Sequence, residues 1–320
     1  MSRIVVTGRV PEPAVESLRA AHDVDGHEST EPISRDALLR KVSGADALVS
    51  LLTERIDAEL LDAAGSQLQV VANVAVGYDN IDVPACAERG VMVTNTPGVL
   101  IEATADIAFG LILMITRRLG EGERVIRSRT SWSWGMFYLL GSGLQGKTLG
   151  IVGLGGIGAA TARRARAFGM RIAYASPTEC DPKLARELQA TRMDTDELLA
   201  TADVVSLHCP YSNVTHHLIG AEQLALMRHT AYLINTARGP IVDEAALVEA
   251  LRTGQIAGAG LDVFEHEPLV HEGLLELDNV ALVPHLGSAT IETRTAMAQL
   301  AADNVLAVLA GEEPLTEVRS

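Results

Sequence analysis

The feature that most constrains this chain is a glycine loop with the spacing G-x-G-x-x-G. The loop joins an apolar strand pattern over residues 148–152 to a helical pattern over residues 157–168. In that setting the first glycine permits a tight turn, the second lets the backbone approach a pyrophosphate, and the third lets helix and strand pack closely. Free amide groups at the start of the helix favour an anion. The sequence therefore predicts a dinucleotide site at Gly153, Gly155, Gly156, Ile157 and Gly158.

Short apolar strands and amphipathic helices alternate along almost the whole chain of 320 residues. This rhythm is typical of parallel sheets with helices on both faces, so we expect an α/β fold with two doubly wound domains. A helical pattern over residues 290–310 has no strand after it, and we expect it to pack back on the first domain. The predicted domains are residues 1–99 with 288–320, and residues 100–287. One long helix is expected over residues 102–128.

Composition limits the classes of function. Acidic residues number 41 and basic residues 26, and the net charge of −15 disfavours binding to nucleic acid or to anionic membranes. The longest apolar run, residues 107–115, is far shorter than the ~20 residues that span a bilayer. The N-terminal residues are typical of a strand rather than of a signal peptide. Three scattered cysteines, Cys86, Cys180 and Cys209, predict neither a disulfide framework nor a metal site, so we expect a cytoplasmic protein.

The residues after the second strand of the nucleotide-binding unit bear on the choice of cofactor. NAD sites usually carry Asp or Glu about 20 residues after the glycine loop, where the carboxylate binds the ribose 2′-hydroxyl. Here Ser176 stands at that position, so no carboxylate repels a 2′-phosphate. An Arg often follows in NADP sites, but Pro177 takes its place, and Glu179 and Asp181 lie nearby. We expect a nicotinamide cofactor, with NADP(H) favoured over NAD(H).

Three polar residues stand at or just after the carboxyl ends of predicted strands in the second domain: Arg238, Glu267 and His285. Ligands of doubly wound sheets bind at that edge, so side chains distant in the chain can meet there. His is the usual general acid near neutral pH, a carboxylate can hold its tautomer, and Arg can bind a carboxylate or polarise a carbonyl. The set matches carbonyl reduction by hydride transfer. A surface ion pair for the Arg and a structural role for the His are the alternatives.

Residues 130–146 interrupt the α/β rhythm with an apolar loop. They contain both tryptophans of the chain and a run of other large side chains: Trp132, Trp134, Met136, Phe137, Tyr138, Leu139 and Leu140. So much apolar surface in a loop needs a cover. We expect this segment to be the arm of a homodimer, with packing on its own domain as the alternative.

Five segments of the chain have distinctive local sequences in a definite order. They are NVAVGYDNID (residues 73–82), GKTLGIVG (146–153), NTARGPIVD (235–243), GLDVFEHEP (260–268) and PHLGSA (284–289). Together they resemble the D-isomer-specific 2-hydroxyacid dehydrogenases, and the resemblance covers essentially the whole chain. It implies a flavodoxin-like substrate domain over residues 1–99 and 288–320, and a Rossmann domain over residues 100–287.

The resemblance also implies roles for individual residues. Arg238 would bind the carboxylate and keto oxygen of the substrate, His285 would be the acid/base, and Glu267 would pair with His285. Asp262 would contact the nicotinamide carboxamide. The implied substrate set adds Val76, Gly77 and Ser288, and the implied cofactor set adds Cys209, Pro210, Thr236, Ala237 and Gly287.

Within the family the chain looks most like the glyoxylate/hydroxypyruvate reductases. The similarity lies in the loop over residues 132–143, the sequence Ser288-Ala289-Thr290 and the serine-containing second strand. It implies a homodimeric enzyme that reduces small 2-oxo acids to 2-hydroxy acids with NAD(P)H. A family member acting on phosphite or on a bulkier 2-oxo acid is the alternative enzyme. A cofactor-sensing, corepressor-like binding protein is the alternative from another class.

Overall fold

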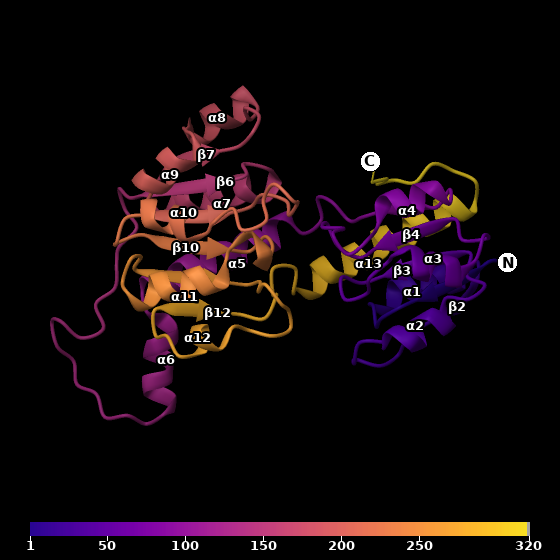
Figure 1. Ribbon diagram of the computed structural model, residues 1–320, viewed down its shortest axis with the longest axis horizontal. Helices are drawn as coiled ribbons and strands as arrows, with labels where there is room; N and C mark the ends of the chain where they lie inside the picture. The colour runs from indigo at the N-terminus through magenta and orange to yellow at the C-terminus, as the bar shows by residue number, and fades with distance from the viewer. Residues whose placement is uncertain (319–320) are drawn as a thin grey trace. The chain divides into compact units, whose positions relative to one another are not determined.

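The computed structural model describes residues 1–318, which fold into two compact units. One unit combines Met1–Leu100 with a C-terminal segment that begins at Ala289, and the other is Ile101–Ser288. Each unit is built around a sheet whose paired strands run parallel (Figure 1). The expected α/β class with two parallel sheets is therefore confirmed.

The sheet of the first unit has the strand order β2-β1-β3-β4-β5. Its strands are β1 (Arg3–Val6), β2 (Asp23–Asp25), β3 (Ala47–Ser50), β4 (Val70–Asn73) and β5 (Met92–Thr94). Side chains alternate along each strand, so Ile4 and Val6 are buried on one face and Val5 on the other. The face that carries Ile4 is covered by α1 (Glu12–Arg19) and α13 (Ile291–Leu309). The face that carries Val5 is covered by α2 (Arg35–Lys41), α3 (Ala58–Ala64) and α4 (Val83–Glu88).

The C-terminal helix α13 returns to the first unit because it carries a stripe of small side chains. Ala298, Ala301 and Ala302 are buried on it together with Val305. These short side chains let α13 pack against α1, β3 and β4, and Figure 1 shows it in yellow beside β4. The first unit is thus made from both ends of the chain.

The sheet of the second unit has the order β12-β11-β10-β9-β6-β7-β8. Its strands are β6 (Thr148–Val152), β7 (Arg171–Ala175), β8 (Thr191–Arg192), β9 (Val204–Leu207), β10 (Tyr232–Asn235), β11 (Gly258–Leu261) and β12 (Val280–Leu282). One face of this sheet is covered by α5 (Ile101–Thr116), α7 (Gly156–Ala167) and α8 (Pro182–Leu188). The other face is covered by α9 (Thr195–Thr201), α10 (Ala221–Leu226), α11 (Glu244–Arg252) and α12 (Glu272–Leu275). The strand order reverses between β6 and β9, and ligands of such sheets bind at that reversal, outside the carboxyl ends.

The single long helix expected over residues 102–128 is wrong. The structure has α5, which ends at Thr116, and a separate α6 (Leu119–Arg127). Arg118 between them has a left-handed φ of +53°. The carbonyl of Thr116 accepts from the Ser142 amide at 2.7 Å, where a continuing helix would use the amide of residue 120. The chain returning from residues 130–141 therefore ends α5.

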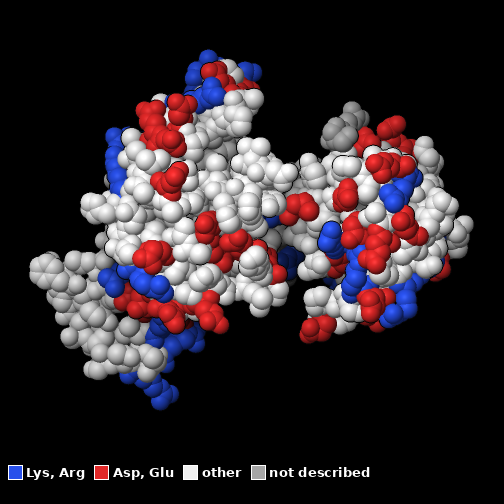
Figure 2. Space-filling model, in the orientation of Figure 1, with Lys and Arg blue, Asp and Glu red and all other residues white. Residues whose placement is uncertain are grey.

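Charged side chains of both signs are spread over both units on the face drawn in Figure 2. Among residues 1–318, none of the helices combines the length and the apolar character needed to cross a membrane. Within the same residues no group of three or more His, Cys, Asp or Glu side chains is arranged to hold a metal ion.

Candidate active site

The glycine loop lies where the strand order reverses, beside the end of β9. Gly153 has a φ of +93°, and a Cβ there would lie 2.6 Å from the amide nitrogen of Cys209. At Gly158 a Cβ would lie 2.6 Å from the carbonyl oxygen of Gly153. Neither position admits a side chain, because the atoms in the way belong to the backbone. The turn requires the first glycine, and the packing of α7 on β6 requires the third.

The start of α7 opens on unfilled space. Gly155 is its N-cap, no side chain caps the helix, and no atom lies within 4 Å of a Cβ built on Gly155. The amides of Gly156, Ile157 and Gly158 donate to no acceptor in residues 1–318. Unpaired amides at a helix start bind anions, so these residues fit the pyrophosphate of a dinucleotide. Gly156 also packs on α5, since a Cβ there would lie 2.7 Å from Ile101 Cδ1.

The end of β7 brings a serine and an arginine together. The hydroxyl of Ser176 accepts from the Leu154 amide at 3.0 Å, and so it holds the glycine loop. Arg192 donates through Nη2 to the carbonyls of Ser176 and Pro177, each at 3.0 Å, and its Nη1 lies 3.5 Å from Glu179 Oε1. Sequence reasoning missed this cation because it comes from β8, which pairs with β7. Arg192 reaches the end of β7 through the pairing of the two strands, although it is not a neighbour of Ser176 in the sequence.

Cys209 and Pro210 follow β9, and Thr236 and Ala237 follow β10, at the edge that carries the glycine loop. Burial raises the pKa of the Cys209 thiol to about 11, so the thiol is uncharged at neutral pH. The hydroxyl of Thr236 is buried and has no hydrogen-bond partner within residues 1–318. A buried unpaired hydroxyl costs free energy, and a ligand with a polar group at this edge would relieve that cost.

The same edge brings His285, Glu267 and Arg238 together. Nδ1 of His285 lies 2.8 Å from Oε2 of Glu267, and the Phe264 amide donates to Oε1 of Glu267 at 3.0 Å. Burial acts to raise the pKa of Glu267, but the hydrogen bond and charge of His285, then the Phe264 amide and the charge of Arg238, hold it below its ordinary value. The carboxylate is therefore ionised at neutral pH. The His285 and Glu267 side chains stay 33% and 35% exposed, which leaves the pair open to a ligand.

His285 has a left-handed backbone conformation, with a φ of +52°, which is uncommon for a residue other than glycine. Asp262 holds it there. The Asp262 carbonyl accepts from the His285 amide at 2.8 Å, and its carboxylate accepts from the amides of Leu286 and Gly287 at 2.5 and 2.8 Å. Burial raises the pKa of Asp262. Whatever Asp262 contacts in a cofactor, it also fixes the segment that carries the histidine.

Arg238 follows β10 in a turn that Asn235 and Gly239 shape. The Asn235 side chain is buried, donates to the Arg238 carbonyl at 2.8 Å and accepts from the Ala237 amide at 3.0 Å. At Gly239 a Cβ would lie 1.9 Å from the carbonyl carbon and oxygen of Phe264. The turn with Arg238 therefore packs directly on the segment with Glu267. Sequence reasoning gave neither Asn235 nor Gly239 a role, although both stand in the NTARG segment.

The remaining expected substrate residues lie within their own units. Val76 and Gly77 are half-buried in the turn after β4 of the first unit, and Ser288 is the last residue of the second unit. The roles given to the site residues stay predictions.

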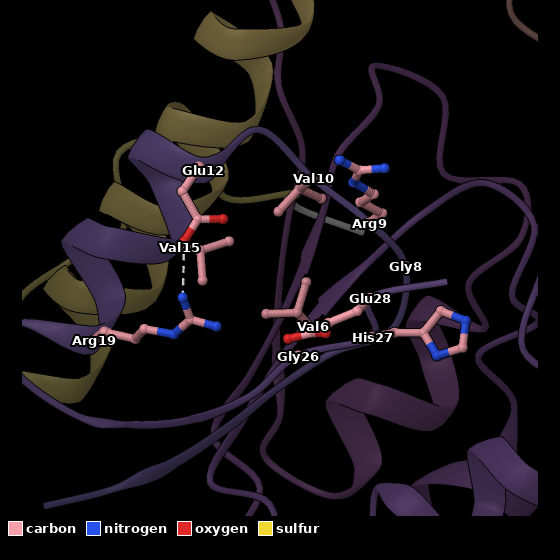
Figure 3. Close-up of a pocket in the computed structure, with 10 residues that line it drawn as sticks. All are labelled: Val6, Gly8, Arg9, Val10, Glu12, Val15, Arg19, Gly26, His27 and Glu28. Atoms are coloured by element: carbon pink, nitrogen blue, oxygen red, sulfur yellow. Dashed lines mark hydrogen bonds and ion pairs between the residues drawn. The ribbon is translucent and has the colours of Figure 1, made fainter. Parts of the chain in front are cut away.

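The first unit also has a cavity of about 380 Å³ at the carboxyl ends of β1 and β2 (Figure 3). Its charged and titratable lining residues are Arg9, Glu12, Arg19, His27 and Glu28. Figure 3 shows Arg19 turned toward Glu12, with Nη1 2.8 Å from Oε1. None of the expected site residues lines this cavity, so it is distinct from the candidate active site.

The fold consists of parallel sheets with helices on both faces, and the glycine loop lies where the strand order reverses. A His–Glu pair lies at the same edge of the sheet. This combination is that of a nicotinamide-dependent dehydrogenase. Residues 109–287 match the family model described as D-isomer specific 2-hydroxyacid dehydrogenase, NAD binding domain. The chain belongs to the family of D-isomer specific 2-hydroxyacid dehydrogenases, which confirms the resemblance seen in its motifs.

Individual relatives match over nearly the full length. A glyoxylate reductase of Thermococcus onnurineus is 50% identical over 320 residues, covering 99% of this chain and 95% of the relative. A solved structure of a protein from Thermus thermophilus has a TM-score of 0.93 and 45% identity, covering 99% of this chain and 100% of that one. The solved structure of an NADPH-dependent glyoxylate/hydroxypyruvate reductase of Sinorhizobium meliloti, in complex with NADP and malonate, has a TM-score of 0.85 and 38% identity. The match covers 99% of this chain and 96% of that one.

Proposed function

We propose that this chain reduces small 2-oxo acids, glyoxylate and hydroxypyruvate among them, to 2-hydroxy acids with NAD(P)H. The observation that carries the proposal is the His285–Glu267 pair, with 2.8 Å between Nδ1 and Oε2, at the sheet edge that also holds Arg238 and the glycine loop. The 50% identity to a glyoxylate reductase supports the choice of substrate class.

His285 is the proton donor of the proposed reaction. The cofactor, when bound, supplies a hydride to the carbonyl carbon of the substrate. Because Nδ1 of His285 faces Glu267, the proton given to the substrate oxygen is held at Nε2. The ionised Glu267 accepts from Nδ1 and so fixes the ring with Nε2 free to face the substrate.

The substrate is held by its carboxylate. The guanidinium of Arg238 has the planar donors that bind a carboxylate and polarise a keto oxygen. The main-chain amides of Val76 and Gly77 are further donors for the carboxylate, and Ser288 adds a hydroxyl. We assign these residues to the binding of the substrate. The proposed cofactor-binding residues are those of the glycine loop together with Cys209, Pro210, Thr236, Ala237, Asp262 and Gly287.

NADP(H) is the proposed cofactor. No carboxylate stands at position 176, and the guanidinium of Arg192 lies against the carbonyls of Ser176 and Pro177, where it can pair with a 2′-phosphate. Arg192→Ser should raise the KM for NADPH by about tenfold and leave the KM for NADH almost unchanged, since only NADPH carries that phosphate. Arg163→Ser is the control, because Arg163 is also exposed and paired with a carboxylate, Glu187. Equal effects of Arg192→Ser on both cofactors would contradict the assignment.

The proposal includes a homodimer in the cytoplasm. Its supports are the exposed aromatic arm over residues 130–146, and the three free cysteines, which suit a reducing compartment.

The experiment that tests the function is loss of reduced-nicotinamide absorbance with glyoxylate, hydroxypyruvate, pyruvate and 2-oxoisovalerate, each against NADPH and NADH. Fast oxidation with glyoxylate or hydroxypyruvate supports the proposal. Activity only with NADH keeps the substrate class and refutes the NADP preference. Turnover of none of the four acids, with tight dinucleotide binding retained, refutes the proposal and favours a cofactor-sensing protein.

A further inference from the structure

The turn after β4 has its carbonyls occupied and its amides free. The carbonyl of Val76 accepts from Asn95 Nδ2 at 2.8 Å, and the carbonyl of Gly77 accepts from Asn73 Nδ2 at 2.9 Å. The amides of Val76 and Gly77, by contrast, donate to no acceptor in the described part of the chain, residues 1–318. Successive unpaired N–H groups of this kind suit an anion.

Two asparagines thus hold the two peptide groups that flank Gly77. In a trans peptide the C=O and the following N–H point in opposite directions. Asn95 holds the Val76 carbonyl, so the Gly77 N–H points away from Asn95. Asn73 holds the Gly77 carbonyl and so prevents the next peptide from rotating. The direction of the Gly77 amide is therefore set by side chains that are not themselves at the ligand.

Asn73 is held firmly enough for this task. It is the last residue of β4 and is fully buried. Its Oδ1 accepts from the Ser50 hydroxyl at 3.2 Å, and its Nδ2 also lies 3.2 Å from Oδ1 of Asn80. A carbonyl can only accept, so Nδ2 must be the atom that faces Gly77. The amide of Asn73 has one orientation that satisfies all its partners.

Asn80 extends the network to the loop after β3. Its Nδ2 donates to the carbonyls of Leu51 and Glu54 at 3.2 and 3.0 Å. Glu54 is buried, and its Oε2 accepts from the Thr7 hydroxyl at 2.6 Å and the Leu51 amide at 2.7 Å. The turn that offers the free amides is therefore tied to two neighbouring strand ends.

We propose that Asn73 and Asn95 are positioning residues for the substrate: they hold the Val76 and Gly77 carbonyls inward so that the amides of this turn meet the carboxylate of the 2-oxo acid. This inference rests on the proposed function and names the residues that make the carboxylate site. A carbonyl compound without a carboxylate, such as a simple aldehyde, gains no binding affinity from the two asparagines.

The test compares Asn73→Ala and Asn95→Ala with Asn279→Ala. Asn279 is the matched control, because its Nδ2 also donates to main-chain carbonyls, those of Leu251 and Ala257, but at the amino end of β12. Each of the first two variants should raise the KM for glyoxylate about tenfold, the factor expected for one misplaced charge-assisted hydrogen bond, with kcat and the Kd of NADPH within about twofold. Asn279→Ala should leave all three values unchanged. Unchanged KM in both Asn73→Ala and Asn95→Ala would overturn the inference and leave the proposed function standing.

A second readout does not depend on turnover. Hydrogen exchange of the peptide over residues 74–80 is measured in the full-length protein, with and without NADP⁺ and oxamate, an unreactive carboxylate. We expect oxamate to protect this peptide in the wild type and in Asn279→Ala, and to protect it much less in Asn95→Ala. Absence of protection in the wild type refutes the carboxylate site even if glyoxylate is reduced. If Asn73→Ala fails to fold, Asn95→Ala decides the question, because Asn95 is only half-buried.

Discussion

At the scale of single residues, one arrangement recurs at both strand ends that carry expected substrate-binding groups. Asn73 ends β4 and donates to the carbonyl of Gly77; Asn235 ends β10 and donates to the carbonyl of Arg238. Both asparagines are buried. The short amide suits this position because it donates and accepts at once and so satisfies the strand end and the turn together. Burial removes water that would compete for these hydrogen bonds, so each turn is held in one conformation.

The turnover of the proposed reaction should depend on Glu267. In Glu267→Gln the charged acceptor that holds Nδ1 of His285 becomes a neutral amide, and kcat should fall by about tenfold with the Kd of NADPH unchanged. His285→Ala is the comparison and should lose turnover on the order of 10²–10⁴-fold. An unchanged kcat in Glu267→Gln would show that the pair, despite its 2.8 Å contact, does not position the proton donor.

The same substitution tests stability. The pKa of Glu267 is lower in the folded chain than its ordinary value, so its ionised form stabilises the fold above the ordinary carboxyl pKa. That stabilisation is lost as the pH falls through the lowered pKa. We expect the Tm difference between wild type and Glu267→Gln to be larger at neutral pH than in acid, measured by thermal denaturation across that range.

At the scale of elements, local pattern predicted the apolar strands well and the polar ones poorly. The interior strands β3, β4, β6 and β9 are buried and mostly apolar, and the strand expected over residues 148–152 is β6. The edge strands β2 and β8 carry the polar sequences DVD and TR, which are too short for a periodic pattern, and only pairing with β1 and β7 makes them strands. The break between α5 and α6 likewise depends on Ser142, 26 residues beyond Thr116, which no local pattern includes.

The contact between the Arg238 turn and the Glu267 segment predicts the effect of one methyl group. In Gly239→Ala the new Cβ would lie 1.9 Å from the Phe264 carbonyl, so the backbone must move. We expect a loss of about 2 kcal/mol or more in the free energy of unfolding, together with a lower kcat. Gly110→Ala is the control: it lies inside α5 with no atom within 4 Å of a Cβ, and should stabilise by about 0.5–1 kcal/mol. Urea denaturation of both variants checks the opposite signs; destabilisation of equal size would refute the contact.

At the scale of the whole molecule, the apolar arm is left uncovered by its own unit. Trp134, Met136 and Phe137 are 78%, 71% and 88% exposed, and Trp132 stacks on Tyr138 with the ring centres 6.2 Å apart. The alternative of packing on its own domain is therefore not what the structure shows. Large exposed apolar segments mark interaction sites, and a second copy of the chain is the partner we propose.

Light scattering at micromolar concentration should give twice the chain mass of 33.9 kDa. The double variant Trp134→Ser/Phe137→Asp should shift the protein to the monomer, because a charge at the centre of an apolar interface is costly to bury. Leu275→Asp, at an exposed leucine of α12 outside the arm, should remain dimeric. A monomeric wild type would refute the dimer.

The sequence by itself determined the α/β class, the glycine loop, the return of the C-terminal helix and the family, because each follows from a local pattern or from motifs read in order. It also selected His285, Glu267 and Arg238, whose roles stay predictions. Only the tertiary structure decided that Arg192 reaches the end of β7, that Asn73 and Asn95 hold the turn at Gly77, that Asp262 fixes the His285 segment, and that the arm stays exposed. Each of these depends on groups far apart in the chain, which parallel strand pairing and burial bring to one edge of a sheet.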